Sequence, residues 1–250
     1  KDGDNILFQA LKPGVEHLTT AYDNRKKAPK NFFFPHTEKM MKYTRTEKGM
    51  TFADEFPGAK EAVLFGVRPC DARSFLLLDM LFDQEKYRDP YYIGRREKTT
   101  VVSLACIHPP YTACFCTSVG GRPTDDAGAD VLLTEIGDRY LVEFITPKGE
   151  RLEKYFTGEK AGEDADAKKQ AIADQAAREI LSHIPAREIK PILDVNFDHP
   201  FWNTIHQKCI ACGTCTYLCP TCHCFDISDE MKGDDGVRIR NWDSCMFPLF

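Results

Sequence analysis

Four cysteines near the end of the chain have a spacing that is typical of iron ligands. They lie in the run CIACGTCTYLCP over residues 209–220, which has the C-x2-C-x2-C-x3-C-P spacing that ligates a [4Fe-4S] cluster. Thiolates two residues apart on a curling loop can meet separate corners of such a cluster, Gly213 lets the backbone approach it, and Pro220 redirects the chain. The spacing therefore predicts four ligands: Cys209, Cys212, Cys215 and Cys219.

The fourth of these ligands has two possible roles. In ferredoxins with two clusters, the last cysteine of such a run ligates the other cluster, so Cys219 serves either the cluster of the first three cysteines or a neighbouring one. A second run of this kind does not occur in the 250 residues. The final residues 246–250 (MFPLF) resemble the interior of a domain. We therefore expect the polypeptide to continue past Phe250 and the domain of this run to be incomplete here.

Two other metal groups fit this segment less well. Structural zinc sites use two cysteine pairs that are separated by about 12 to 20 residues, whereas Cys212 and Cys215 belong to one uninterrupted series. Residues 219–223 (CPTCH) match the C-x-x-C-H motif of covalent haem attachment. Haem attachment would leave Cys209, Cys212 and Cys215 without a purpose, so we favour the iron-sulfur cluster.

A second group of cysteines lies far upstream. Cys70 follows one predicted strand, and Cys106, Cys114 and Cys116 follow the next. Because α/β folds place ligand sites at the carboxyl edge of the sheet, these four thiols could meet there and hold another [4Fe-4S] cluster. The alternative is that Cys70 is a small buried hydrophobe and that Cys114 and Cys116 point to opposite faces of an extended segment. We favour a second cluster, because Pro109-Pro110 stiffens the loop and free thiols near iron chemistry are readily oxidised.

Three cysteines remain without an assignment: Cys222, Cys224 and Cys245. They are candidates for ligands of a further cluster or for groups that contact one. His108 and His223 neighbour cysteines, but packing or a surface position is the commoner role of such histidines. Four side chains are expected to shield the C-terminal cluster from solvent: Ile210, Tyr217, Leu218 and Phe225. The sequence thus predicts at least one [4Fe-4S] cluster and favours two or more.

The composition argues against several classes of protein. The eleven cysteines are odd in number, which argues against the disulfide framework of a secreted protein. A net charge of −5 without a basic patch gives no reason to expect nucleic acid as a partner. No apolar stretch approaches the ~20 residues that span a bilayer, and residues 1–5 (KDGDN) do not begin an export signal. We therefore expect a cytoplasmic protein without a membrane span.

Elements of α/β type must position the upstream cysteines. Residues 62–67 and 99–104 are apolar runs of strand length, and residues 70–82 have the length and leucine content of a helix. Apolar residues on both sides of Gly137-Asp138 predict a β-hairpin. The spacing of apolar residues between Gly162 and Pro185 predicts a helix that ends just before that proline.

These elements define the fold class that we expect. The aromatic run over residues 31–35 is predicted to anchor a loop or a short strand to the core. We predict an α+β protein, with an α/β domain over residues 1–203 and a ferredoxin-like [4Fe-4S] domain over residues 204–250.

Several short blocks, in the same order along the chain, resemble one known family. The blocks are FGVRPCDA at 65–72, ACFCTSVGG at 113–121, CTYLCPTCHCFD at 215–226 and WDSCM at 242–246. They resemble the 4Fe-4S dicluster family that includes the beta subunits of sulfhydrogenases and the iron-sulfur subunits of anaerobic sulfite reductases. Similar subunits accompany heterodisulfide-reductase-like and flavin oxidoreductase complexes. The resemblance extends over most of the chain from about residue 31.

The resemblance implies an electron-transfer subunit of an anaerobic, hetero-oligomeric redox complex. Such a subunit relays single electrons between a flavin-containing partner, linked to NAD(P)H or ferredoxin, and a catalytic partner subunit. No general acid or nucleophile is recognisable, as expected of a non-catalytic subunit in which the cofactor does the chemistry. Two other functions stay open: a catalytic reductase subunit that binds a flavin or an acceptor itself, and a docking module in which the clusters are structural.

Overall fold

The computed structural model describes residues 27–55 and 58–247. The chain forms two compact units that interleave along the sequence. Of the described residues, the first unit takes 63–74 and 100–210, and the second unit takes the rest. Each unit has a four-stranded sheet of its own. The division of the sequence at residue 203 stays a prediction.

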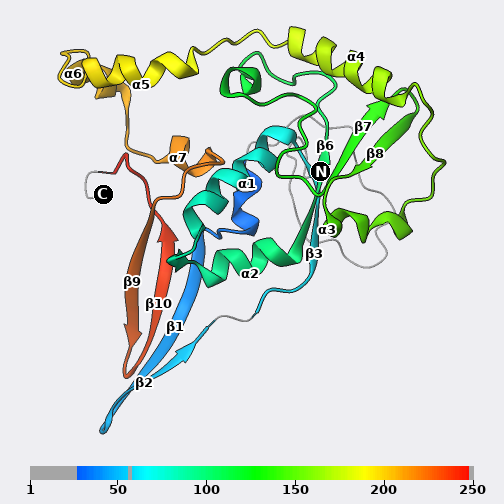
Figure 1. The fold of residues 1–250 in the computed structure, drawn as a ribbon. Coiled ribbons are helices and arrows are strands. Elements are labelled where there is room, and N and C mark those ends of the chain that lie inside the picture. Colours follow the sequence, from blue (N-terminus) through cyan, green and yellow to red (C-terminus); the bar gives the residue numbers. More distant parts are fainter. Residues whose placement is uncertain (1–26, 56–57, 248–250) are drawn as a thin grey trace. The chain divides into compact units, whose positions relative to one another are not determined.

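The sheet of the first unit is mixed, with the strand order β3-β6-β7-β8 (Figure 1). Its strands are β3 (Ala62–Val67), β6 (Thr99–Leu104), β7 (Val131–Ile136) and β8 (Arg139–Phe144). β6 and β7 are parallel, and β7 and β8 are antiparallel. Side chains on both faces of β6 and β7 are buried, as in covered parallel strands: Val101, Val102, Val131 and Leu132. The predicted strands and the hairpin around Gly137 are confirmed.

Helix α1 (Pro69–Phe82) follows β3 and confirms the predicted helix. The later α-helices of the first unit are α3 (Pro147–Glu150), α4 (Ala165–Arg178), α5 (Ala186–Val195) and α6 (Trp202–Ile205), and its 3-10 turns are η2 (Cys116–Val119), η3 (Glu153–Tyr155) and η4 (His206–Lys208). Within the described residues, no helix is both long and apolar enough to cross a membrane.

The predicted helix before Pro185 is shorter than its apolar pattern indicated. α4 begins after Asp164, as expected, but it ends at Arg178, so the prediction that it reaches Pro185 is wrong. The chain leaves the helix because it bonds to a neighbouring loop: the N–H of Ile184 donates to Ser118 Oγ, and the Ser182 hydroxyl donates to the carbonyl of Thr112, both at 2.9 Å. Pro185 further disfavours helical backbone at the residue before it.

The sheet of the second unit is antiparallel, with the strand order β2-β1-β10-β9 (Figure 1). Its strands are β1 (Thr37–Thr46), β2 (Gly49–Asp54), β9 (Phe225–Lys232) and β10 (Asp235–Trp242). β1 pairs with β10 from Thr37 opposite Asn241 to Thr44 opposite Asp235, with a bulge between Lys39 and Met41. This pairing joins the early and the late parts of the described chain.

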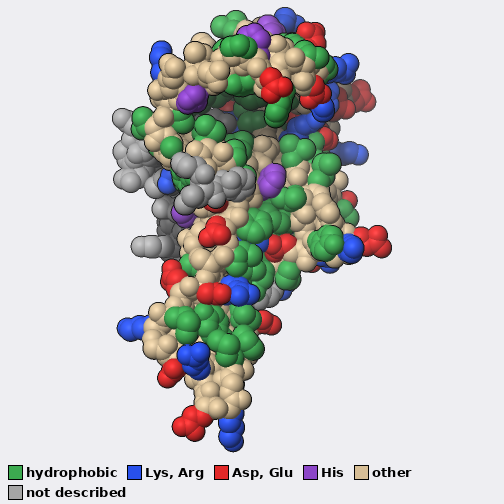
Figure 2. Space-filling view, turned by 90° about the vertical axis from the view of Figure 1, so that its left-hand side faces the viewer, with side chains coloured by type: hydrophobic (Ala, Val, Ile, Leu, Met, Phe, Trp, Pro, Cys, Tyr) green, Lys and Arg blue, Asp and Glu red, His purple; other side chains and the backbone are tan. Residues whose placement is uncertain are grey.

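One face of this sheet is apolar toward the β1–β2 turn. Tyr43 lies opposite Phe52 on β2 and opposite Gly236 on β10, and Gly236 lies opposite Met231 on β9. The tyrosine ring covers the glycine so closely that a Cβ there would lie 2.3 Å from ring atoms. Phe52 and Met231 are exposed, and Figure 2 shows hydrophobic side chains gathered along this part of the sheet.

The aromatic run over residues 31–35 contributes to the core of the second unit, as predicted. The 3-10 turn η1 (Pro29–Phe32) leads into Phe33 and Phe34, which are fully buried. Phe33 packs edge-on against Phe75 with ring centroids 4.8 Å apart, and Phe34 stacks on Trp242 at 5.7 Å. Three short elements complete this unit before the cysteine run: β4 (Asp83–Gln84), β5 (Tyr87–Arg88) and α2 (Pro90–Lys98).

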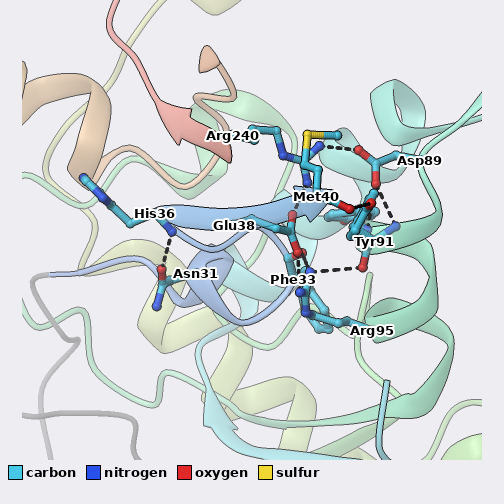
Figure 3. A network of polar contacts seen from close by, with 10 residues as sticks. Asn31, Phe33, His36, Glu38, Met40, Asp89, Tyr91, Arg95 and Arg240 are labelled. Carbon is cyan, nitrogen blue, oxygen red and sulfur yellow. Dashed lines mark hydrogen bonds and ion pairs between the residues drawn. The ribbon is translucent and has the colours of Figure 1, made fainter. Parts of the chain in front are cut away.

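A buried ion-pair network joins β1, β10 and α2 (Figure 3). The guanidinium of Arg240 pairs with the carboxylates of Glu38 and Asp89, and its side chain is 2% exposed. Glu38 also pairs with Arg95 on α2. Asp89 caps α2 by accepting hydrogen bonds of 2.9 Å from the N–H groups of Tyr91 and Tyr92. Because buried charges are tolerated only when they are paired, this network fixes the sheet against the helix.

Candidate iron-sulfur sites

Two residues with left-handed backbone bracket Cys212. Ala211 has φ 53° and Gly213 has φ 67°. For alanine, this conformation is uncommon and costs roughly 1–2 kcal/mol, and such local strain is characteristic of binding and catalytic loops. Gly213 precedes the short helix α7 (Thr214–Leu218), which carries Cys215, and Cys219 follows that helix directly. The backbone therefore curls tightly where the sequence predicts cluster ligands.

Residues 244–247 pack against one side of this tightly curled loop. A Cβ at Gly213 would lie 2.9 Å from the ring of Phe247, so only glycine fits there without displacing the ring. The buried hydroxyl of Thr216 bonds both to the carbonyl of Gly213 and to the hydroxyl of Ser244, each at 2.8 Å. Ser244 is itself fully buried. The loop that carries the ligands is therefore braced by packing and by buried hydrogen bonds.

A buried lysine lies beside the cysteines that follow this loop. Lys30 is 1% exposed. Its Nζ donates to the carbonyls of Cys222 (2.7 Å) and Thr216 (3.2 Å), and it stands 4.3 Å from the centroid of the Trp242 ring. Burial lowers the pKa of Lys30, while attraction to the sulfurs of three cysteines opposes that shift: Cys222, Cys219 and Cys224. Both hydrogen bonds go to neutral carbonyls, so negative charge on these sulfurs would compensate the buried cation.

Hydrogen bonds already favour the thiolate at two of the predicted ligands. Bonds with the side chain and backbone of Thr214 lower the pKa of Cys212. At Cys219, burial acts to raise the pKa, but hydrogen bonds from Thr221 and Cys222 outweigh it, and the pKa is lowered. Because the thiolate is the form that binds metal, both positions suit a cluster ligand.

The prediction that four side chains shield this site from solvent is wrong for the chain as described. Ile210 is 84% exposed, and Leu218 and Phe225 are also exposed. Tyr217 alone is half-buried. The first three cysteines of the run, Cys209, Cys212 and Cys215, are likewise exposed. The cause is the curl itself, which is braced through Gly213 and Thr216 and leaves the neighbouring side chains and thiols at the surface.

The unassigned cysteines lie near the end of this run. Cys222 is hydrogen-bonded to Cys219, and Cys224 lies within electrostatic range of Cys222. The carbonyl of Cys224 accepts a 2.9 Å hydrogen bond from the N–H of Asp243, two residues before the exposed Cys245. Their role as ligands or neighbours of a cluster stays a prediction.

The two histidines beside cysteines have ordinary partners. His108 pairs with Glu179 across 2.9 Å at the surface, and His223 bonds through Nδ1 to the carbonyl of Thr221 at 3.0 Å. Both contacts agree with the surface roles that we expected for these side chains.

The first unit brings together the four upstream cysteines. Each thiol lies within electrostatic range of at least two of the others: Cys70, Cys106, Cys114 and Cys116. Burial raises the pKa of Cys106 to about 11 against the opposing effect of Arg68, and the neighbouring Cys116, Cys114 and Asp71 add to the rise. Cys70 is exposed and the other three are partly buried.

The spacing of the thiols differs from that of a mononuclear metal site. Around one zinc ion, with Zn–S bonds of ~2.3 Å, neighbouring thiolates lie about 4 Å apart. Nowhere in the described parts of the chain do three or more His, Cys, Asp or Glu side chains meet closely enough to hold a single metal ion. A [4Fe-4S] cluster is larger and binds one thiolate at each of four separate iron atoms.

Sequence reasoning missed two residues of the C-terminal site, Lys30 and Ala211. Lys30 precedes Cys222 by 192 positions, and no local pattern indicates that an isolated lysine is buried. Its place directly before the aromatic run over residues 31–35 was the available signal. Ala211 lies inside the cysteine run, but alanine favours helix, so its left-handed backbone could not be read from its type.

Comparisons with known proteins agree with the cysteine pattern. Residues 208–250 match the family model described as a 4Fe-4S dicluster domain. The chain is 30% identical over 239 residues to sulfhydrogenase 2 subunit beta of Pyrococcus furiosus, and the match covers 94% of this chain and 68% of that relative. No solved structure matches significantly. The chain is thus an α+β protein with a C-terminal 4Fe-4S domain, and it belongs to the family of iron-sulfur proteins that includes the sulfhydrogenase beta subunits.

Proposed function

We propose that this chain is a non-catalytic electron-transfer subunit of a cytoplasmic, hetero-oligomeric redox complex. It relays single electrons between a flavin-containing subunit, linked to NAD(P)H or ferredoxin, and a catalytic subunit of the hydrogenase, sulfite reductase or heterodisulfide-reductase-like kind. The observation that carries the proposal is the cysteine run over residues 209–219 inside the segment that matches a 4Fe-4S dicluster domain. The relative named as a sulfhydrogenase subunit supports the assignment to a multi-subunit complex.

The residues of the C-terminal site fit an iron-sulfur cluster. Soft thiolates are the ligands that such clusters prefer, and Cys209, Cys212 and Cys215 would hold one. Cys219 would complete that site or serve a neighbouring cluster in a ferredoxin-like arrangement. When bound, the cluster takes up and releases one electron at a time. The buried Lys30, whose hydrogen bonds go to neutral carbonyls, supplies the positive charge that a thiolate-rich anion requires.

The protein's own residues then have two tasks. Lys30 and the braced loop around Gly213 hold the ligands in place and set the charge around them.

The test is a redox titration of the full chain, purified without oxygen. We expect iron and acid-labile sulfide, a visible absorption that dithionite bleaches reversibly, and loss of the C-terminal signal in Cys212→Ser. The matched control is Thr51→Ala, an exposed hydroxyl on β2, which should keep the signal. A cluster that cannot be reduced reversibly would favour a structural role. Flavin fluorescence released on denaturing the chain would favour the catalytic reductase instead.

A further inference from the structure

Two separate stretches of the first unit bring four thiols to one place. Cys70 lies in the first turn of α1, directly after β3, and Cys106 follows the neighbouring strand β6 by two residues. Cys114 and Cys116 lie in the loop that continues from Cys106. Because Cys70 is remote in sequence from the other three, local chain geometry does not explain why it lies within electrostatic range of Cys106 and Cys116.

The segments that carry these thiols are firmly held. Arg68 donates from Nη1 to the carbonyls of Leu104 (3.3 Å) and Ala105 (2.9 Å), which joins the end of β3 to the end of β6. The N–H of Cys106 donates to the carbonyl of Pro123 at 2.8 Å. A loop that is pinned in this way can present ligands without losing much conformational entropy when a cofactor binds.

The second half of the loop is held against α1 in the same manner. The N–H of Gly121 donates to the carbonyl of Cys116 at 2.9 Å, and Arg73 on α1 pairs with Asp125 at 3.1 Å. The Arg73 side chain also runs along Gly120 and Gly121, where added Cβ atoms would lie 3.4 and 3.6 Å from it. Arg68 and Arg73 therefore lie beside the four thiols, together with the carboxylates of Asp71 and Asp125.

A purely structural role does not suit these cysteines. Free cysteines that serve packing are among the most buried residues of a protein, but Cys70 is exposed and the other three are only partly buried. Thiols that lie close to one another are prone to oxidation. Metal binding would deprotonate them and give the four thiols a function that packing does not.

We propose that Cys70, Cys106, Cys114 and Cys116 hold a second iron-sulfur cluster, of the [4Fe-4S] class, in the first unit. The site is independent of the C-terminal run, and its ligands all belong to one compact unit. Four thiolates match the four iron corners of a cubane.

The experiment compares metal content in variants of the full chain purified without oxygen. Cys106→Ser and Cys116→Ser should each lose about four iron and four sulfide ions per chain relative to wild type. Both variants should keep the dithionite-reduced electron paramagnetic resonance signal that Cys212→Ser abolishes. The matched control is Ser182→Ala, which loosens the same loop at Thr112 without removing a thiol, and it should keep full iron content. Unchanged iron in both cysteine variants would overturn the proposal while leaving the relay function intact.

A second measurement on the wild-type chain covers the case in which the variants do not fold. The native protein is alkylated without oxygen, before and after iron is removed with a chelator, and the labelled peptides are mapped by mass spectrometry. Cys70, an exposed residue of the site, should be protected in the iron-loaded chain and labelled after iron removal. Equal labelling of Cys70 in both states, or zinc with no sulfide bound at these four cysteines, would refute the site.

Discussion

Lys30 donates a 2.7 Å hydrogen bond from Nζ to the backbone carbonyl of Cys222. The contact places a buried positive charge beside the segment that joins Cys219, the last cysteine of the predicted run, to Cys224. A nearby cation stabilises the reduced form of a cluster more than the oxidised form, because the reduced form carries one more negative charge. Lys30 is thus a residue that can set the reduction potential without ligating iron.

Replacing Lys30 should shift that potential. In Lys30→Met, we expect the midpoint of the C-terminal cluster to fall by roughly 50 mV, since a charge at this range in a protein is worth on the order of 1 kcal/mol for one electron. The measurement is a redox titration followed by electron paramagnetic resonance. The control is Lys39→Met, which removes an exposed cation from β1 of the same unit and should leave the potential nearly unchanged. Identical potentials in wild type and Lys30→Met would refute this role.

The buried network around Arg240 should dominate the stability of the second unit. Arg240→Gln leaves the carboxylates of Glu38 and Asp89 short of a partner, and we expect a loss of about 3–5 kcal/mol in the free energy of unfolding. Arg238→Gln, two residues earlier on β10, breaks an exposed pair with Asp229 and should cost far less, because exposed ion pairs contribute little to stability. Urea denaturation of both variants tests the difference, and equal losses would contradict it.

Two glycines with the same backbone angle separate conformational strain from packing. Gly213 and Gly233 both have φ 67°, but an added Cβ meets the Phe247 ring only at Gly213. Gly233→Ala should cost about 1 kcal/mol for the left-handed backbone. Gly213→Ala should cost a further 1–3 kcal/mol, roughly the penalty for overpacking, and should lower iron content. If both variants load iron equally well, the brace from Phe247 is not needed for the site.

The strain at Ala211 predicts a stabilising substitution. Ala211→Gly removes the steric cost of left-handed alanine and should raise the free energy of unfolding by up to about 1 kcal/mol. Ala171→Gly, at an exposed position inside α4, should lower it by about 1 kcal/mol because glycine is a poor helix former. Thermal unfolding of the two variants checks the opposite signs. A loss of stability in Ala211→Gly would mean that this backbone is not strained.

The sequence predicted best those elements whose buried residues are consecutive in the chain. The strands over residues 62–67 and 99–104 and helix α1 could be predicted because their apolar runs are continuous. The position of Cys70 after one strand and Cys106 after the next also followed from that pattern. α5 was not predicted, because Pro191 lies inside it and removes a helical N–H.

The sheet of the second unit could not be predicted for a different reason. β2 is exposed along its whole length and β9 along most of it, so neither shows the alternation of buried and exposed side chains that identifies a strand. The pairing of β1 with β10 depends on Arg240 and Glu38 meeting across 202 positions. The burial of Lys30 depends on the same long-range assembly, since the carbonyls that it contacts lie 186 and 192 positions later.

The pairing of β1 with β10 also sets the order of events during synthesis. β1 can find its partner only after the ribosome has released residues 235–242, and Ser244 and Phe247, which brace the ligand loop, emerge later still. Before that point in synthesis, neither the β1–β10 pairing nor the contacts of Ser244 and Phe247 can hold Lys30 and the cysteines over residues 209–224 in place. The four upstream cysteines, in contrast, are all translated by residue 116. We therefore expect the cell to deliver iron to the C-terminal cysteines later than to those of the first unit.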